Sequence, residues 1–325
     1  MRRRKESGHD NAVQDSQNSF PSSSATIHKP VLLTETIGFL APRDGGIYVD
    51  GTLGLGGHAE CILEKCGPGG RLIAFEWDDN AIRLARERLQ AYGPRLLIIK
   101  NNFAEIKNSL AAINVAKVDG LILDLGLSSL QLDGENGGGS GRGFSFQRSE
   151  PLDMRMDSSR QLTASELINK AKEDELADIL YHYGHERHAR RIAARIVQER
   201  KKEPVDTSDR LARIVAAAVP RRFHPKKIHV ATKVFQATRI AVNSELANLA
   251  RILDDAPSIL KAEGRFCVIS FHSLEDRMVK RKFKEDPALE VLTRKPITPT
   301  KEECLLNPRA RSAKLRAAAV KSQEV

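Results

Sequence analysis

The sequence of 325 residues has few features of membrane-spanning or secreted proteins. It contains no run of about 18 apolar residues, which argues against a transmembrane helix. Its first 26 residues are charged and polar and lack the apolar segment of a secretory signal. Only four cysteines occur, none in a C-x-x-C pair or at zinc-ligand spacing. We therefore expect a cytoplasmic protein with free thiols, no metal site and no membrane partner.

Basic residues are concentrated in two stretches of a chain whose net charge is +10. Residues 186–239 hold fifteen Lys or Arg against five Asp or Glu, and residues 294–321 hold eight against two. Such stretches are typical of a surface that faces a polyanion such as nucleic acid. A solubilising helix face is the alternative reading of each stretch.

Strand-like and helix-like segments alternate over the first third of the chain. Short apolar runs predict strands, and the amphipathic segments between them predict helices. This alternation indicates an α/β fold, in which a doubly wound, mostly parallel sheet is covered by helices on both faces. The expected strands are 46–52, 71–77, 95–103 and 118–126.

The alternation stops after the fourth strand and resumes much later. A glycine-rich loop follows, then helical patterns over 163–219, and a fifth core strand is expected at 263–271. A helical domain is therefore inserted into the sheet domain. We expect a disordered tail (1–26), the first part of the core (27–133), the loop and insert (134–232) and the second part of the core with a basic C-terminal segment (233–325).

A glycine-rich turn follows the first expected strand. Gly54, Gly56 and Ala59 match the pattern G-x-G-x-x-A, and a helix start lies directly behind them. Glycine lets a ligand approach the backbone, and a helix N-terminus offers free N–H groups. Glu76 ends the second strand, where a carboxylate can accept hydrogen bonds from a ribose. This pattern fits NAD, FAD and S-adenosylmethionine (SAM) equally well.

Asp124 ends the buried fourth strand, beside the first. In doubly wound sheets the crevice at the carboxyl ends of these strands is where ligands bind. A carboxylate at the end of an apolar strand is costly unless it has a purpose. We therefore expect Asp124 to face the ligand.

Several long motifs resemble those of the ribosomal RNA small-subunit methyltransferase H family, also called MraW. The resemblance covers nearly everything from residue 27 to about residue 316. The motifs are HKPVLL (28–33), DGTLGLGGH (50–58), LDLGLSSLQLD (123–133), RGFSF (142–146), PLDMRMD (151–157), FQATRIAVNSEL (235–246), ISFHSLEDR (269–277) and NPRARSAKLR (307–316).

The resemblance implies a Rossmann-like, SAM-dependent enzyme with an inserted helical domain. It would methylate N4 of one cytidine in the decoding region of 16S rRNA, on a partly assembled 30S subunit. The family's SAM contacts fall on Gly56, Gly57, His58, Glu76, Phe103, Asp124 and Gln131. Departures are few: Glu76 replaces the family's usual Asp, Leu55 a frequent basic residue and Leu130 a frequent proline, and ENGGGSG lengthens the loop before RGFSF.

Methylation of an exocyclic amine requires orientation of the amine and removal of a proton. Asp124 is the first candidate for contact with N4, and His272 in the turn SFHS (270–273) is the second. His272 can equally be a helix cap. The base must leave its stack, and we expect the loop 134–143 to form a lid and Phe144 or Phe146 to stack on the base, or else to anchor the loop.

We expect RNA to contact the basic insert and the C-terminal segment, with strong salt dependence. The expected residues are Arg190, Arg191, Arg221, Arg222, Lys226, Lys227, Arg309 and Arg311. Two rival readings are an NAD(P)- or FAD-dependent oxidoreductase and a non-catalytic assembly factor that binds RNA. The oligomeric state, monomer or homodimer, stays open.

Overall fold

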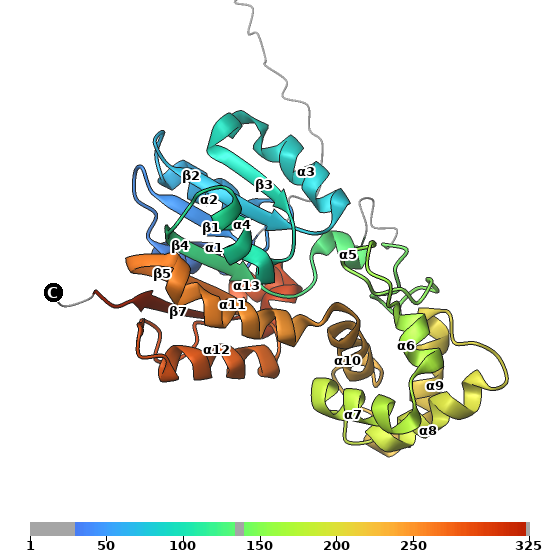
Figure 1. Ribbon diagram of the computed structural model, residues 1–325. Coiled ribbons are helices and arrows are strands. Elements are labelled where there is room, and N and C mark those ends of the chain that lie inside the picture. The colour runs from blue at the N-terminus through green and yellow to red at the C-terminus, as the bar shows by residue number, and fades with distance from the viewer. Residues whose placement is uncertain (1–29, 134–139, 323–325) are drawn as a thin grey trace, which may run out of the picture.

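A computed structural model of the chain describes residues 30–133 and 140–322. The expected tail (1–26) and most of the expected lid lie outside these residues. The described part consists of a sheet flanked by helices and a helical body beside it (Figure 1). No helix within this part of the chain is long and apolar enough to cross a bilayer.

The central sheet has seven strands in the order β3-β2-β1-β4-β5-β7-β6. All neighbouring pairs up to β5 are parallel, and β7 runs antiparallel to both β5 and β6. The predicted α/β fold is confirmed, and the fourth strand lies beside the first as expected. The strands are β1 (Ile47–Asp50), β2 (Arg71–Glu76), β3 (Leu96–Lys100), β4 (Val118–Asp124), β5 (Leu260–Ser270), β6 (Leu289–Val291) and β7 (Lys314–Val320).

Helices cover both faces of the sheet, and each face has its own hydrophobic cluster. One face packs against α1 (Leu33–Leu40), α2 (Gly57–Lys65) and α3 (Asp79–Leu89). The other packs against α4 (Ile106–Ala112), α11 (Glu245–Ile259) and α12 (Ser273–Glu285). Burial of strands on both faces explains why their sequences are apolar almost without interruption.

Two strands at the C-terminal side of the sheet were not expected from the sequence. The segment of β7 reads KLRAAAV, and its alanines favour helix over strand. Its residues from Leu315 to Ala319 are nevertheless buried between β5 and β6. Arg316 is buried and pairs with Asp276 on α12 (Nε to Oδ1 2.6 Å). Part of the second basic stretch therefore serves the core and is not available to a polyanion.

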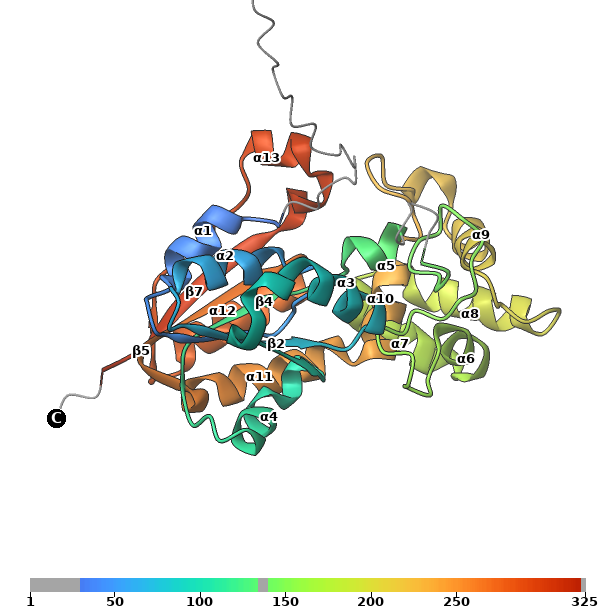
Figure 2. The same cartoon turned by 90° about the horizontal axis from the view of Figure 1, so that it is seen from above.

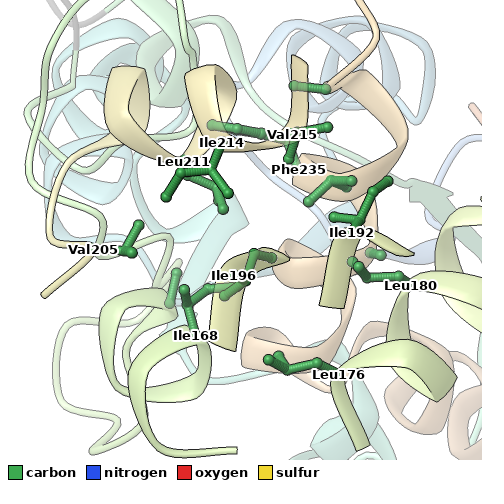
Figure 3. Packing of buried hydrophobic residues seen from close by; sticks show 14 of the residues in the cluster. Ile168, Leu176, Leu180, Ile192, Ile196, Val205, Leu211, Ile214, Val215 and Phe235 are labelled. Carbon is green, nitrogen blue, oxygen red and sulfur yellow. The ribbon is translucent and has the colours of Figure 1, made fainter. Parts of the chain in front are cut away.

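The insert packs five helices around a hydrophobic core of its own (Figure 3). These are α6 (Ala164–Lys170), α7 (Glu173–Gly184), α8 (Ala189–Arg200), α9 (Ser208–Ala218) and α10 (Thr232–Asn243). Val234, Phe235 and Ala237 of α10 belong to this core. Their packing favours a domain boundary at the end of α10, about one helix later than residue 232.

The chain returns from the insert to the sheet domain through a sharp bend between α10 and α11. Ser244 forms the bend with a left-handed backbone (φ 54°), which ends one helix and starts the next. The buried Asn243 beside it donates to Met154 O (2.8 Å) and accepts from Met156 N–H (2.8 Å). This amide therefore fixes the PLDMRMD segment against the bend.

Short elements complete the described chain. Figure 2 shows that α13 and the segment between α9 and α10 project on the same side of the molecule. The short elements are α5 (Ser129–Asp133) and α13 (Lys301–Leu306), with 3-10 helices at Gln90–Arg95, Phe103–Glu105, Arg221–Phe223 and Pro308–Ser312.

Candidate cofactor and substrate site

A large pocket opens at the carboxyl ends of β1, β2 and β4, where the insert meets the sheet domain. It brings together six of the seven residues expected to contact the cofactor. These are Gly57, His58, Glu76, Phe103, Asp124 and Gln131. The seventh, Gly56, caps the N-terminus of α2 directly beside them. The geometry thus supports the positions taken from the motifs.

The glycines of the turn meet two different requirements. Gly56 has a left-handed backbone (φ 81°), which L side chains rarely adopt. Gly57 lies against Pro30, and a Cβ on it would be 2.2 Å from Pro30 Cγ. Pro30 itself lines the pocket. The glycines therefore shape the turn and let the pocket wall pack closely.

Glu76 closes β2 with its carboxylate folded back onto the turn. Its two oxygens accept N–H groups from Gly54 (3.0 Å), Trp77 (2.9 Å) and Asp78 (3.0 Å). Burial raises the pKa of Glu76 above its ordinary value, and these three bonds oppose that rise. This fold-back accommodates the length of the glutamate side chain. The acid still lines the pocket.

His58 connects the turn to the fourth strand. Its buried ring lies with Nε2 3.1 Å from Val31 O and Nδ1 3.7 Å from Asp124 Oδ2. A proton on Nε2 would satisfy the carbonyl and leave Nδ1 toward the carboxyl group. His58 therefore lies beside Asp124, and both residues line the pocket.

Asp124 has the most perturbed environment of the predicted residues. Its backbone N–H donates to Thr52 Oγ1 (2.6 Å), while its buried Oδ1 has no hydrogen-bond partner within the described residues. Burial, together with the charges of Asp50 and Glu275, raises the pKa of Asp124 to about 8. A buried carboxyl oxygen without a partner at a pocket wall is a site for a cationic or hydrogen-bond-donating ligand.

Asp50 is a neighbouring acid that sequence reasoning did not single out. It ends β1, is almost completely buried, and accepts the Thr52 N–H (3.0 Å). Burial raises the pKa of Asp50 to about 7, and the charge of Glu76 adds to the rise. Its position at the start of DGTLGLGGH, at a strand end, was the available signal.

The far wall of the pocket comes from segments distant in the sequence. Glu245 at the start of α11 is held by Arg239 through two bonds of 2.7 Å. Asn248, one turn later, donates to Asn243 O (3.0 Å). These side chains extend the pocket beyond the cofactor residues. The lining residues of this wall are Glu245, Asn248, Phe271, Glu275, Asn307 and Arg309.

His272, the second candidate for contact with the amine, caps α12 and does not line the pocket. Its Nδ1 accepts the Glu275 N–H (3.4 Å), and its Nε2 lies 3.2 Å from Glu275 Oε1. Although burial raises the pKa of Glu275, the bond and charge of His272 hold it below its ordinary value. Glu275 lines the pocket instead, so the catalytic role of His272 stays a prediction.

Ligand atoms of Glu245, His272 and Glu275 lie within 4.8 Å of one another, as in a metal site. However, Arg239 occupies the Glu245 carboxylate, and backbone N–H groups of Phe271 and His272 occupy Glu275 Oε2. A guanidinium beside the cluster also opposes a cation. The group is therefore built as an ion-pair and capping network.

The described end of the glycine-rich loop is fastened to the cofactor side of the pocket. Arg142 pairs with the buried Asp78 (2.5 Å), two residues after Glu76. Phe144 is buried in the insert, and Phe146 packs against His229 and Phe235 (ring centroids 4.6 and 5.1 Å). These contacts anchor the loop, and the stacking of one of these rings on the base stays a prediction.

The residues expected to bind RNA divide into two groups. All except Arg309 are exposed, and Arg309 lies partly buried in the pocket wall. Other basic residues of the insert pair with acids on the same helix, such as Arg195 with Glu199 and Arg213 with Asp209. These pairs lie on solvated helix faces. Their basic residues are therefore distinct from the residues expected to bind RNA.

The strand order and the strand-end acids define a class of protein. A dinucleotide-binding sheet has the order 3-2-1-4-5-6, whereas here the antiparallel β7 lies between β5 and β6. The model of the MraW methylase family matches residues 25–321. The chain belongs to the MraW methylase family, and it is a SAM-dependent methyltransferase.

Two named relatives agree with this membership. The chain is 58% identical to the ribosomal RNA small subunit methyltransferase H of Desulfotalea psychrophila, with 90% of this chain and 97% of the relative covered. It is 46% identical to the enzyme of the same name from Syntrophus aciditrophicus, with 92% and 99% covered. A solved putative rRNA methylase from Clostridium thermocellum aligns with a TM-score of 0.45 at 12% identity, over 90% and 98% of the two chains.

Proposed function

We propose that this protein transfers the methyl group of SAM to N4 of a cytidine in small-subunit ribosomal RNA. The observation that carries the proposal is a pocket in which the expected cofactor residues, Asp124 among them, face a far wall with the polar side chains Asn248 and Arg309. The relatives' names supply the RNA. The decoding region as target, a partly assembled 30S subunit as substrate and the cytoplasm as location belong to the same proposal.

The residues fit a bound SAM. Glu76 would hold the ribose, Phe103 would pack on the adenine, and the turn at Gly56 and Gly57 would lie along the methionine part. The unpartnered Asp124 Oδ1 can accept a hydrogen bond from the ligand, and a positive charge beside this carboxyl group would favour its ionised form. When bound, SAM supplies an activated methyl donor, so the protein has mainly to orient the amine.

Asp124 is also suited to receive the proton that the amine loses. A base with a pKa near the working pH combines the correct protonation state with sufficient basicity, and the pKa of Asp124 is about 8. Donors on the far wall, the Asn248 amide and the Arg309 guanidinium, suit the N3 and O2 acceptors of cytosine. Uracil would present an O4 acceptor to the Asp124 carboxyl group instead of an amine.

Mass spectrometry of ribosomal RNA tests the proposal. A strain that lacks the gene should lose one N4-methylcytidine, and the wild-type gene should restore it. Restoration by the Asp124→Asn gene at full yield would show that Asp124 is not the partner of N4. An unchanged spectrum after deletion would favour a non-catalytic assembly factor.

A further inference from the structure

A second hollow lies between the insert and the sheet domain, apart from the cofactor pocket. Its walls are the C-terminal end of α7 and the first turns of α12. The lining residues are Tyr181, His182, His185, Arg187, Leu274 and Arg277. No acidic side chain lines it within the described residues.

The acids nearest in sequence are occupied elsewhere. Asp276 pairs with Lys314 (3.0 Å) and Arg316 (2.6 Å), on the side of the sheet. Glu186 is buried and accepts the His188 N–H (2.8 Å). Arg187 and Arg277 are exposed and form no ion pair with any described residue. The lining side chains therefore bring two guanidinium groups and no acid to the hollow, and the exposed Asp178, one turn before His182 on α7, is not among them.

The C-terminal end of α7 brings a further basic residue close to the hollow. His185 caps α7 in the left-handed conformation (φ 48°), and its carbonyl accepts Lys233 Nζ (3.0 Å). Lys233 thus adds a further positive charge beside the hollow. Two guanidinium groups, two imidazoles and a phenol form a donor set that suits a phosphate.

The hollow adjoins the methyl-transfer pocket through α12. Leu274 lines the hollow, and the next residue, Glu275, lines the pocket. An RNA strand that places a base in the pocket carries phosphates on both sides of that base. We propose that the hollow binds a backbone phosphate of the substrate RNA and so joins the insert to the sheet domain across the strand. This inference rests on the proposed function for the identity of the polyanion.

The test is a double variant, Arg187→Gln with Arg277→Gln, compared with the matched Arg71→Gln. Arg71 is also exposed but begins β2, at the opposite end of the sheet. The probe is single-stranded oligocytidylate RNA, with affinity measured by fluorescence anisotropy between about 50 and 200 mM salt. Each lost phosphate contact should reduce the slope of log K against log salt by about 0.7.

We expect the double variant to bind the RNA about tenfold more weakly at low salt, with a smaller slope. Its SAM affinity by calorimetry should equal that of the wild type, which also reports correct folding. A slope and affinity equal to those of Arg71→Gln would overturn the proposal. If inorganic phosphate raises the melting temperature of the wild type only, while the RNA slopes agree, the hollow takes free phosphate and the assignment to RNA is wrong.

The anisotropy assay does not depend on methyl transfer. Suppose that the wild type fails to methylate small-subunit RNA, while the salt slopes of the wild type and the double variant differ as expected. This result would contradict the proposed function and leave the phosphate site standing. Full methylation by the wild type, with equal slopes for the wild type and the double variant, would overturn the phosphate site and leave the proposed function standing.

Discussion

Replacement of Asp124 by Asn should make the protein more stable at alkaline pH while it abolishes most activity. Asp124 has a pKa of about 8 in the folded protein, against an ordinary value of 3.8 for an aspartate side chain. Because the folded state binds the proton more tightly, the free energy of unfolding falls as pH rises from about 4 to about 8. An amide carries no charge and avoids this loss.

The size of the effect follows from the shift. Each pKa unit is worth about 1.4 kcal/mol, so the full shift sets an upper limit of about 6 kcal/mol. The side chain is 23% exposed, and the neighbouring Asp50 also has a raised pKa. The contribution of Asp124 to the free energy of unfolding is therefore smaller than this limit. We expect Asp124→Asn to exceed the wild type by about 2 kcal/mol at pH 9 and to match it near pH 4.

Urea unfolding at several pH values measures the difference, provided that the m-value stays constant. The matched control is Asp119→Asn, at the other end of the same strand. Burial raises the pKa of Asp119, but the Ile47 N–H and Lys261 outweigh it and lower the pKa overall. This control should therefore be less stable than the wild type at neutral pH, with the loss fading in acid. An Asp124→Asn protein no more stable than wild type at pH 9 would refute the reasoning.

Methyl transfer provides the second readout of Asp124→Asn. Loss of a general base lowers rates by about 10²–10⁴-fold. For the wild type, kcat/KM should rise with pH up to the pKa of about 8 and then level off. A flat profile between pH 6 and 9 would mean that Asp124 does not take the proton.

Three further substitutions test other parts of the pocket. Gly57→Ala places a Cβ 2.2 Å from Pro30 Cγ; it should lower the free energy of unfolding by about 1–3 kcal/mol and weaken SAM binding, as measured by urea unfolding and calorimetry. Glu76→Gln turns an amide donor toward backbone N–H groups; calorimetry should show SAM affinity at least about tenfold weaker, and an unchanged affinity would argue against the ribose contact. Arg142→Met leaves the buried Asp78 without its ion-pair partner. The free energy of unfolding, measured with urea, should fall by about 3 kcal/mol. The double variant Arg142→Met with Asp78→Asn should recover much of this loss.

The architecture was readable from the sequence where burial on both faces leaves a strong pattern. The runs that became β1, β2 and β4 are mostly apolar and lie between a turn and a helix, a pattern typical of buried strands. The segment of β7 shows the limit of this reasoning. Its alanines fit the narrow space between two strands, a tertiary requirement that outweighs their preference for helix.

The site was predictable to the extent that it lies at strand ends. Parallel strands bring their carboxyl ends to one edge, so Glu76 and Asp124 had to approach each other. Glu245 and Asn248 reach the same pocket through the bend at Ser244, which no local pattern indicates. The direction of the His272 ring is likewise set by its cap on α12.

Among the described residues, two polar attachments fasten the insert to the sheet domain beside the pocket, and Trp77 and Leu127 also pack against the core of the insert. One is the Arg142–Asp78 pair, and the other is the bend at Ser244, where Arg160 donates to Ser244 Oγ (3.0 Å) and Arg239 holds Glu245. A chimera that exchanges only the helical body between relatives would cut through both attachments. Domain exchange in this family should therefore succeed only when the residues of both attachments are exchanged together with the helices. The reason is that both attachments lie beside the pocket that would hold the cofactor and the substrate.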